Sequence, residues 1–109
     1  MANYTECRDA CLTCAEACET CAYDCCAGQP EMERCLRTCM DCATICWAAA
    51  TVCARGSEMA PEICRACAAA CEMCGEECSR HADERCQNCA ASCRICAEQC
   101  RAMAGTTSV

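Results

Sequence analysis

Large aromatic side chains are nearly absent from this sequence of 109 residues: it has no phenylalanine, one tryptophan and two tyrosines. A core of large apolar side chains is therefore excluded. The hydrophobic fraction nevertheless reaches 55%, because that fraction includes 22 cysteines. Free cysteine behaves as a small, readily buried hydrophobic residue. The composition predicts an interior rich in thiols.

Basic residues are also few. Lysine is absent, and nine arginines stand against 16 acidic residues, which gives a net charge of −7. This balance disfavours nucleic acid and anionic membrane surfaces as partners. The segment Met1–Arg8 is polar, unlike the start of a signal peptide, and no uncharged apolar run reaches membrane-spanning length. We therefore expect a cytoplasmic protein of one domain.

The cysteines recur with alternating steps of four and three residues, the repeat of a helix packed in a coiled-coil-like bundle. We term the line of cysteines along each helix its seam. Strand alternation fits none of the four stretches that carry the repeat, so we predict an all-α fold, an antiparallel up-down-up-down four-helix bundle with a cysteine-lined core. The four seams hold Cys7, Cys11, Cys14, Cys18, Cys21 and Cys25; Cys35, Cys39, Cys42, Cys46 and Cys53; Cys64, Cys67, Cys71, Cys74 and Cys78; and Cys86, Cys89, Cys93, Cys96 and Cys100.

The connections are marked by the few glycines and prolines. Gly28 and Pro30 separate the first two stretches, Gly56 follows the second, and the seam spacing widens to eight residues between Cys78 and Cys86. Connections this short imply antiparallel neighbours. The expected bundle spans residues 1–104, with helices at about 4–27, 31–54, 58–80 and 83–103, and residues 105–109 are expected to form a disordered tail.

Cysteines four residues apart on a helix suit a metal ion better than a disulfide. Their Cβ atoms lie about 5–6 Å apart, whereas a disulfide requires about 3.5–4.5 Å. Two metal–thiolate bonds of about 2.3 Å each can span the gap. The nine such pairs are Cys7/Cys11, Cys14/Cys18, Cys21/Cys25, Cys35/Cys39, Cys42/Cys46, Cys67/Cys71, Cys74/Cys78, Cys89/Cys93 and Cys96/Cys100.

Charge favours Cu(I) among the ions that thiolates select. Zn(II) held by four cysteines leaves a charge of −2 at each buried site, whereas Cu(I) with bridging thiolates approaches neutrality. Iron–sulfur clusters usually sit on irregular loops. We expect between about eleven and 22 Cu(I) ions and no enzymatic activity. A zinc or mixed-metal buffer of the metallothionein kind is the alternative, and a thiol oxidoreductase, which needs a cysteine singled out by its environment, is a weaker one.

The CxxxC ladder, clearest over Cys86–Cys100, resembles the bacterial copper storage proteins along nearly the whole chain. The resemblance implies a four-helix bundle, usually a tetramer, that stores many Cu(I) ions on core cysteines for copper detoxification or supply. It also implies histidine and methionine ligands at an open mouth. Members that lack an export signal act in the cytosol, and this chain resembles them.

Three features depart from that pattern. Ala49 takes a seam position and leaves Cys53 without a partner on its own helix. Cys26 lies beside Cys25 and off the seam, so a ligand role and an exposed or interhelical thiol are both open. Histidine is scarce at the mouth, which we define as the end of the bundle that holds Cys25, Cys35 and Cys86. There Met32 and His81 are predicted to project inward. The candidate metal ligands are therefore all 22 cysteines, Cys26 included, with His81 and Met32.

Further predictions concern the outer surface of the bundle and the end opposite the mouth. Tyr4, Ala60 and Met103 are predicted to plug the end opposite the mouth, with a ligand role for Met103 as the alternative. Residues 43–54 carry no charge, and this face, with Leu36, Met40 and Trp47, is predicted to pack against another subunit. Trp47 lying over a neighbouring helix of its own chain is the alternative. Copper is expected to arrive with a small thiol or a copper chaperone.

Overall fold

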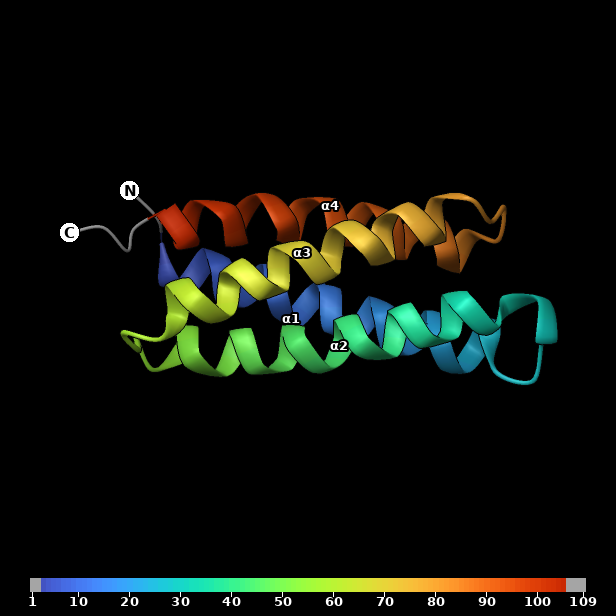
Figure 1. Ribbon diagram of the computed structural model, residues 1–109, viewed down its shortest axis with the longest axis horizontal. Helices are drawn as coiled ribbons and strands as arrows, with labels where there is room; N and C mark the ends of the chain where they lie inside the picture. The colour runs from blue at the N-terminus through green and yellow to red at the C-terminus, as the bar shows by residue number, and fades with distance from the viewer. Residues whose placement is uncertain (1–2, 106–109) are drawn as a thin grey trace.

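Residues 3–105 are described by a computed structural model, in which four α-helices form an elongated bundle of 46 × 19 × 17 Å (Figure 1). The helices are α1 (Tyr4–Thr20), α2 (Glu33–Ala54), α3 (Ala60–Ser79) and α4 (Glu84–Ala104). A π-helical turn, η1 (Cys21–Cys26), continues α1, and a 3-10 turn, η2 (Pro30–Met32), precedes α2. No strand occurs in residues 3–105. The predicted all-α four-helix bundle is confirmed.

The helices run antiparallel, because the α1–α2 and α3–α4 connections lie at one end and the α2–α3 connection at the other (Figure 1). Gly28 and Gly56 have φ angles of 78° and 61°, in the left-handed region that glycine adopts without a steric cost. The side chain of Asn3 accepts a hydrogen bond from the N–H of Glu6, and that of Asp83 from the N–H of Arg85. These caps satisfy N–H groups that the first turns of α1 and α4 leave unpaired.

The interior consists almost wholly of cysteine and alanine side chains. Twenty-one of the 22 cysteines are buried, and only Cys25 is partly exposed. Small core side chains let the helices approach closely: a Cβ atom added to Gly75 of α3 would lie 3.2 Å from the Cβ of Cys93 in α4. The narrow cross-section thus follows from the composition, and it brings sulfur atoms from different helices within contact distance.

The end opposite the mouth is closed differently from the expectation. Met103 and Ala60 are fully buried there, whereas Tyr4 is 40% exposed, so the prediction that Tyr4 helps to plug the bundle is wrong. Tyr4 is the first residue of α1 and has no preceding turn to cover it. Of the expected tail, residues 106–109 lie outside the described residues. No helix within residues 3–105 combines the length and the hydropathy needed to cross a bilayer.

Candidate metal centre

The cysteine sulfurs form one dense network along the bundle axis. Each of the 22 Sγ atoms lies 3.5–4.0 Å from at least one other cysteine Sγ. All 22 are free thiols, with no disulfide among them. The core is therefore a continuous set of soft ligand atoms.

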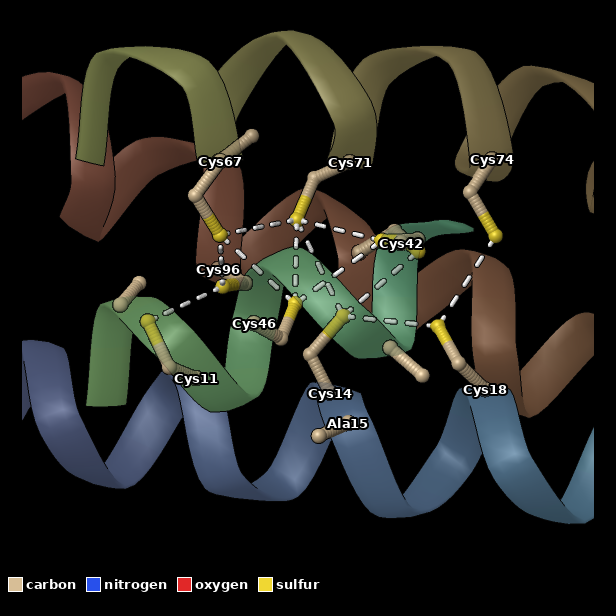
Figure 2. Packing of buried hydrophobic residues seen from close by; sticks show 14 of the residues in the cluster. Cys11, Cys14, Ala15, Cys18, Cys42, Cys46, Cys67, Cys71, Cys74 and Cys96 are labelled. Atoms are coloured by element: carbon tan, nitrogen blue, oxygen red, sulfur yellow. Dashed lines mark hydrogen bonds between the residues drawn. The ribbon is translucent and has the colours of Figure 1, made fainter. Parts of the chain in front are cut away.

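Sulfurs gather in groups of four whose members all lie within 4.8 Å of one another, and at least five such groups each draw on three helices. In one group, Cys14 of α1, Cys42 and Cys46 of α2 and Cys71 of α3 point toward one another (Figure 2). Three sulfurs bound to one ion at about 2.3 Å each would be about 4.0 Å apart. The spacing between core sulfurs is thus already close to that of three-coordinate thiolate binding.

Same-helix pairs account for only part of this network. Five of the nine CxxxC pairs have their sulfurs 3.9–4.0 Å apart: Cys14/Cys18, Cys42/Cys46, Cys67/Cys71, Cys74/Cys78 and Cys96/Cys100. Contacts between helices are as close or closer, such as Cys46–Cys67 and Cys11–Cys96, both at 3.7 Å. Each sulfur can therefore join ions held by neighbouring pairs, which is the geometry that bridging thiolates require.

The turn η1 overturns the expectation for Cys26. Its π-helical geometry brings the N–H of Ala27 to the carbonyl oxygen of Ala22, five residues earlier, at 2.9 Å. Because the π-helical turn contains one extra residue, the position that faces the core moves from residue 25 to residue 26. Cys26 is consequently fully buried, with its Sγ 3.9 Å from that of Cys21, and its placement off the seam is wrong. Cys25 is the residue displaced toward solvent, and its Sγ lies 3.6 Å from that of Cys86.

Cys53 finds its partner across the bundle. Ala49 is fully buried in the seam position where a cysteine would complete α2. The Sγ of Cys53 instead lies 3.7 Å from the Sγ of Cys64 in α3, which is also 3.7 Å from that of Cys7 in α1. The end opposite the mouth therefore keeps a group of linked thiols despite the alanine.

At the mouth, His81 is bound to a carboxylate that the sequence analysis missed. Its Nε2 lies 2.9 Å from Oε2 of Glu77, whose side chain is only 8% exposed. Arg34 of α2 and Arg80 donate to the other oxygen of Glu77 at 3.1 and 3.2 Å. The hydrogen bond from His81, followed by that from Arg34 and the positive charge of Arg80, lowers the pKa of Glu77. His81 follows the end of α3 at Ser79, four residues after Glu77, and this spacing was the available signal. Met32 is partly buried and packs against the cysteine core.

Burial opposes the ionisation of the core thiols. Burial raises the pKa of Cys35 and Cys53, and it raises the pKa of Cys86 to about 12. S–H donors from neighbours, Cys21 first, lower the pKa of Cys78 to about 4. Since a thiol must lose its proton to bind metal as a thiolate, the network stores protons that an entering soft cation displaces.

The comparisons with known proteins agree with this geometry. The sequence model of the copper storage protein family matches residues 1–105. The Cu(I)-bound copper storage protein BsCsp3 of Bacillus subtilis is 42% identical to the chain, with 94% of this chain and 99% of that chain covered and a TM-score of 0.86. No curated protein sequence matches.

A cytosolic copper storage protein from Streptomyces lividans offers a second comparison. Its structure with five coppers is 37% identical, with 96% of this chain and 94% of that chain covered and a TM-score of 0.88. Its structure loaded with 10 copper equivalents is 38% identical, covers 94% of this chain and 83% of that chain, and has a TM-score of 0.86. Both similar proteins are thus described as binding copper, and the Streptomyces lividans protein as taking up several equivalents.

Proposed function

The chain belongs to the copper storage protein family, which stores many Cu(I) ions on core thiolates, and from that premise we propose that all 22 cysteines are ligands. The observation that carries the assignment is the unbroken sulfur network, in which every Sγ has another within 3.5–4.0 Å. Cys26 joins the ligand set because it is fully buried beside Cys21. His81 and Met32 serve as weaker ligands at the mouth, where ions enter and leave.

Storage is stoichiometric and involves no turnover. Cu(I) arrives in the cytoplasm bound to a small thiol or a copper chaperone, exchanges ligands at the mouth, and moves inward from sulfur to sulfur. Support for the location comes from the similar Streptomyces lividans protein, which is described as cytosolic. The same reversible exchange serves copper detoxification or supply. A thiol oxidoreductase is the weaker alternative, because 21 of the 22 thiols are buried and only Cys25 is partly exposed.

Anaerobic titration of the reduced protein with Cu(I) against a competing chelator tests the proposal, with a parallel titration using Zn(II). We expect saturation between about eleven and 22 Cu(I) ions, in the upper part of that range because the sulfur spacing suits bridging three-coordinate binding. Saturation at about four or five ions with Zn(II) preferred would instead identify a zinc buffer.

We further propose that the outer face of α2 around Trp47, which is uncharged over residues 43–54, joins copies of the chain into a tetramer. Met40 and Trp47 on this helix are 43% and 39% exposed, and Leu36 is partly buried. The indole N–H of Trp47 donates to the carboxylate of Glu19 in α1 at 3.1 Å, so the side chain contacts a neighbouring helix of its own chain, as the alternative expected, and is still 39% exposed. Such a face suits burial against a second copy.

Light scattering coupled to size-exclusion chromatography tests the assembly. The wild type should elute with the mass of a tetramer, and Trp47→Arg should shift it to a smaller species. Tyr23→Arg is the matched control, because Tyr23 is also exposed but belongs to η1 and not to α2. A monomeric wild type contradicts the proposal.

A further inference from the structure

One cysteine differs from the other 21 in its exposure to solvent. Cys25 is partly exposed, whereas every other cysteine is buried. Its Sγ lies 3.6 Å from the Sγ of Cys86, which is buried and lies a further 3.5 Å from the Sγ of Cys21. We propose that Cys25 and Cys86 form the acceptor pair through which a donor thiolate complex hands Cu(I) to the core. This inference rests on the proposed storage function and concerns the route of loading.

A continuous line of sulfurs leads inward from this pair. Cys21 shares a four-sulfur group with Cys35, Cys39 and Cys78, all within 4.8 Å. From Cys39 onward, each Sγ atom of the line lies 4.0 Å or less from the next Sγ atom. An ion accepted at the mouth can therefore reach the far end without leaving sulfur. The line runs Cys39, Cys74, Cys18, Cys14, Cys71, Cys46, Cys67, Cys96, Cys11, Cys100, Cys7, Cys64 and Cys53.

The backbone around the acceptor pair is held in place by an arginine. Nη1 of Arg85 donates to the carbonyl oxygen of Asp24 at 2.7 Å, and its remaining donors bind the carboxylate of Asp83. Arg85 precedes Cys86, and Asp24 precedes Cys25. The hydrogen bond thus ties α4 to η1 directly beside both sulfurs. It holds the two sulfurs at a spacing that one Cu(I) can bridge while one of them remains accessible.

The far end offers no comparable route. Cys7, Cys53 and Cys64 are 2% exposed or less, and the fully buried Met103 and Ala60 lie at the same end. At the mouth, the imidazole of His81 is bound to Glu77. Cys25 is therefore the thiol that a bulky donor complex can reach before any helix has to move.

The transfer is an exchange of ligands without a change of oxidation state. The sulfur of Cys25 binds Cu(I) held by two donor thiolates and gives up its proton, and one donor sulfur leaves as the thiol. Cys86 then replaces the second donor sulfur in the same way. Two protein–copper bonds replace two donor–copper bonds, and the two protons pass from the protein thiols to the donor thiols.

Loading kinetics test the acceptor pair. The reduced apo protein is mixed anaerobically with a Cu(I)–glutathione complex, and the rate of uptake and the final copper content are both measured. We expect Cys25→Ser to load about tenfold more slowly, because exchange rates depend on thiol access, and to lose at most about two ions of capacity. Tyr23→Ser is the control: it removes an exposed side chain of the same turn η1 that is not a metal ligand, so it should load at the wild-type rate.

The outcomes separate the route from the storage function. Loading of Cys25→Ser at the wild-type rate, or equal slowing in Tyr23→Ser, overturns the acceptor pair. Saturation of the wild type at about five ions or fewer contradicts storage itself, whatever the rates. Circular dichroism verifies that both variants remain helical. Extraction of copper by a chelator should slow in Cys25→Ser by the same factor as loading, because both directions use one path.

Discussion

Cys21 and Cys26 stand five residues apart, and their sulfur atoms lie 3.9 Å apart across the π-helical turn η1. An α-helical turn would place the residue four positions on, Cys25, against Cys21. The wider turn accommodates one additional residue. Cys26 thereby occupies the core, while Cys25 is released to the surface beside Cys86.

Removal of one residue from this turn should therefore be tolerated. Deletion of Tyr23, which is 63% exposed, places Cys26 four residues after Cys21 and restores α-helical spacing with the same thiol inward. We expect a melting temperature within about 5 °C of the wild type. Deletion of Thr13, an exposed residue in the middle of α1, is the control. It turns every later cysteine of the helix off the seam and should lower the melting temperature by more than about 10 °C. Melting temperatures are measured by circular dichroism. An equal decrease in both deletion variants would contradict the interpretation that η1 contains one residue more than an α-helical turn.

The seams could be read from the sequence because alternating steps of four and three residues define one face of a helix. That argument assumes α-helical geometry throughout, so it placed Cys25 inward and Cys26 outward. The true order depends on η1, a backbone conformation that spacing does not encode. The partner of Cys53 is Cys64 of another helix. Such contacts depend on how far the helices are shifted along their axes, which one helix's pattern cannot specify.

Glu77 was missed for a related reason. Its neighbours on α3 include exposed acids, and nothing in its position alone indicates burial. The carboxylate is buried because Arg34 contacts it from α2 and His81 from the connection that follows α3. A tertiary contact of this kind becomes visible only when the helices are placed together.

Cys25 should be the first thiol to react with an alkylating reagent. Access controls the rate at which a thiol is modified, and the other 21 cysteines are buried. Brief treatment of the reduced apo protein with iodoacetamide, followed by peptide mapping, should find the label mainly at Cys25. The rapid phase should vanish in Cys25→Ser and persist in Cys26→Ser. Even labelling over many cysteines would show that the bundle opens faster than the reagent reacts.

Gly75 sets the distance between α3 and α4. An added Cβ would lie 3.2 Å from the Cβ of Cys93 and 3.7 Å from the carbonyl oxygen of Ala90. Gly75→Val should lower the free energy of unfolding by about 2 kcal/mol, because the branched side chain forces the helices apart. Ala66→Val, at an exposed position of α3, should cost about 0.5 kcal/mol from helix propensity alone. Urea unfolding of the reduced apo proteins measures both free energies. An equal decrease in the two variants would show that the contact between Gly75 and Cys93 does not set the distance between α3 and α4.

Glu77 should stabilise the mouth far more than its neighbour Glu76. Both carboxylates bind Arg80, but the side chain of Glu77 is 8% exposed and that of Glu76 is 76% exposed. Glu77→Gln removes the charge that holds Arg34, Arg80 and His81, and we expect it to cost about 2 kcal/mol in urea unfolding at neutral pH. Glu76→Gln loses one exposed ion pair and should change stability by less than about 0.5 kcal/mol.

The pH dependence of the same pair separates charge from packing. The pKa of Glu77 lies below its ordinary value of 4.5 in the folded protein, chiefly because of its bond with His81. The stabilisation is therefore fully present above pH 4.5 and is lost as the pH falls through the folded pKa, where the carboxylate takes up a proton. The difference between wild type and Glu77→Gln should shrink in urea unfolding curves recorded at progressively lower pH. If the difference stays constant into acid, the loss at neutral pH comes from altered packing of the amide, and the buried charge is not what holds this end of the bundle together.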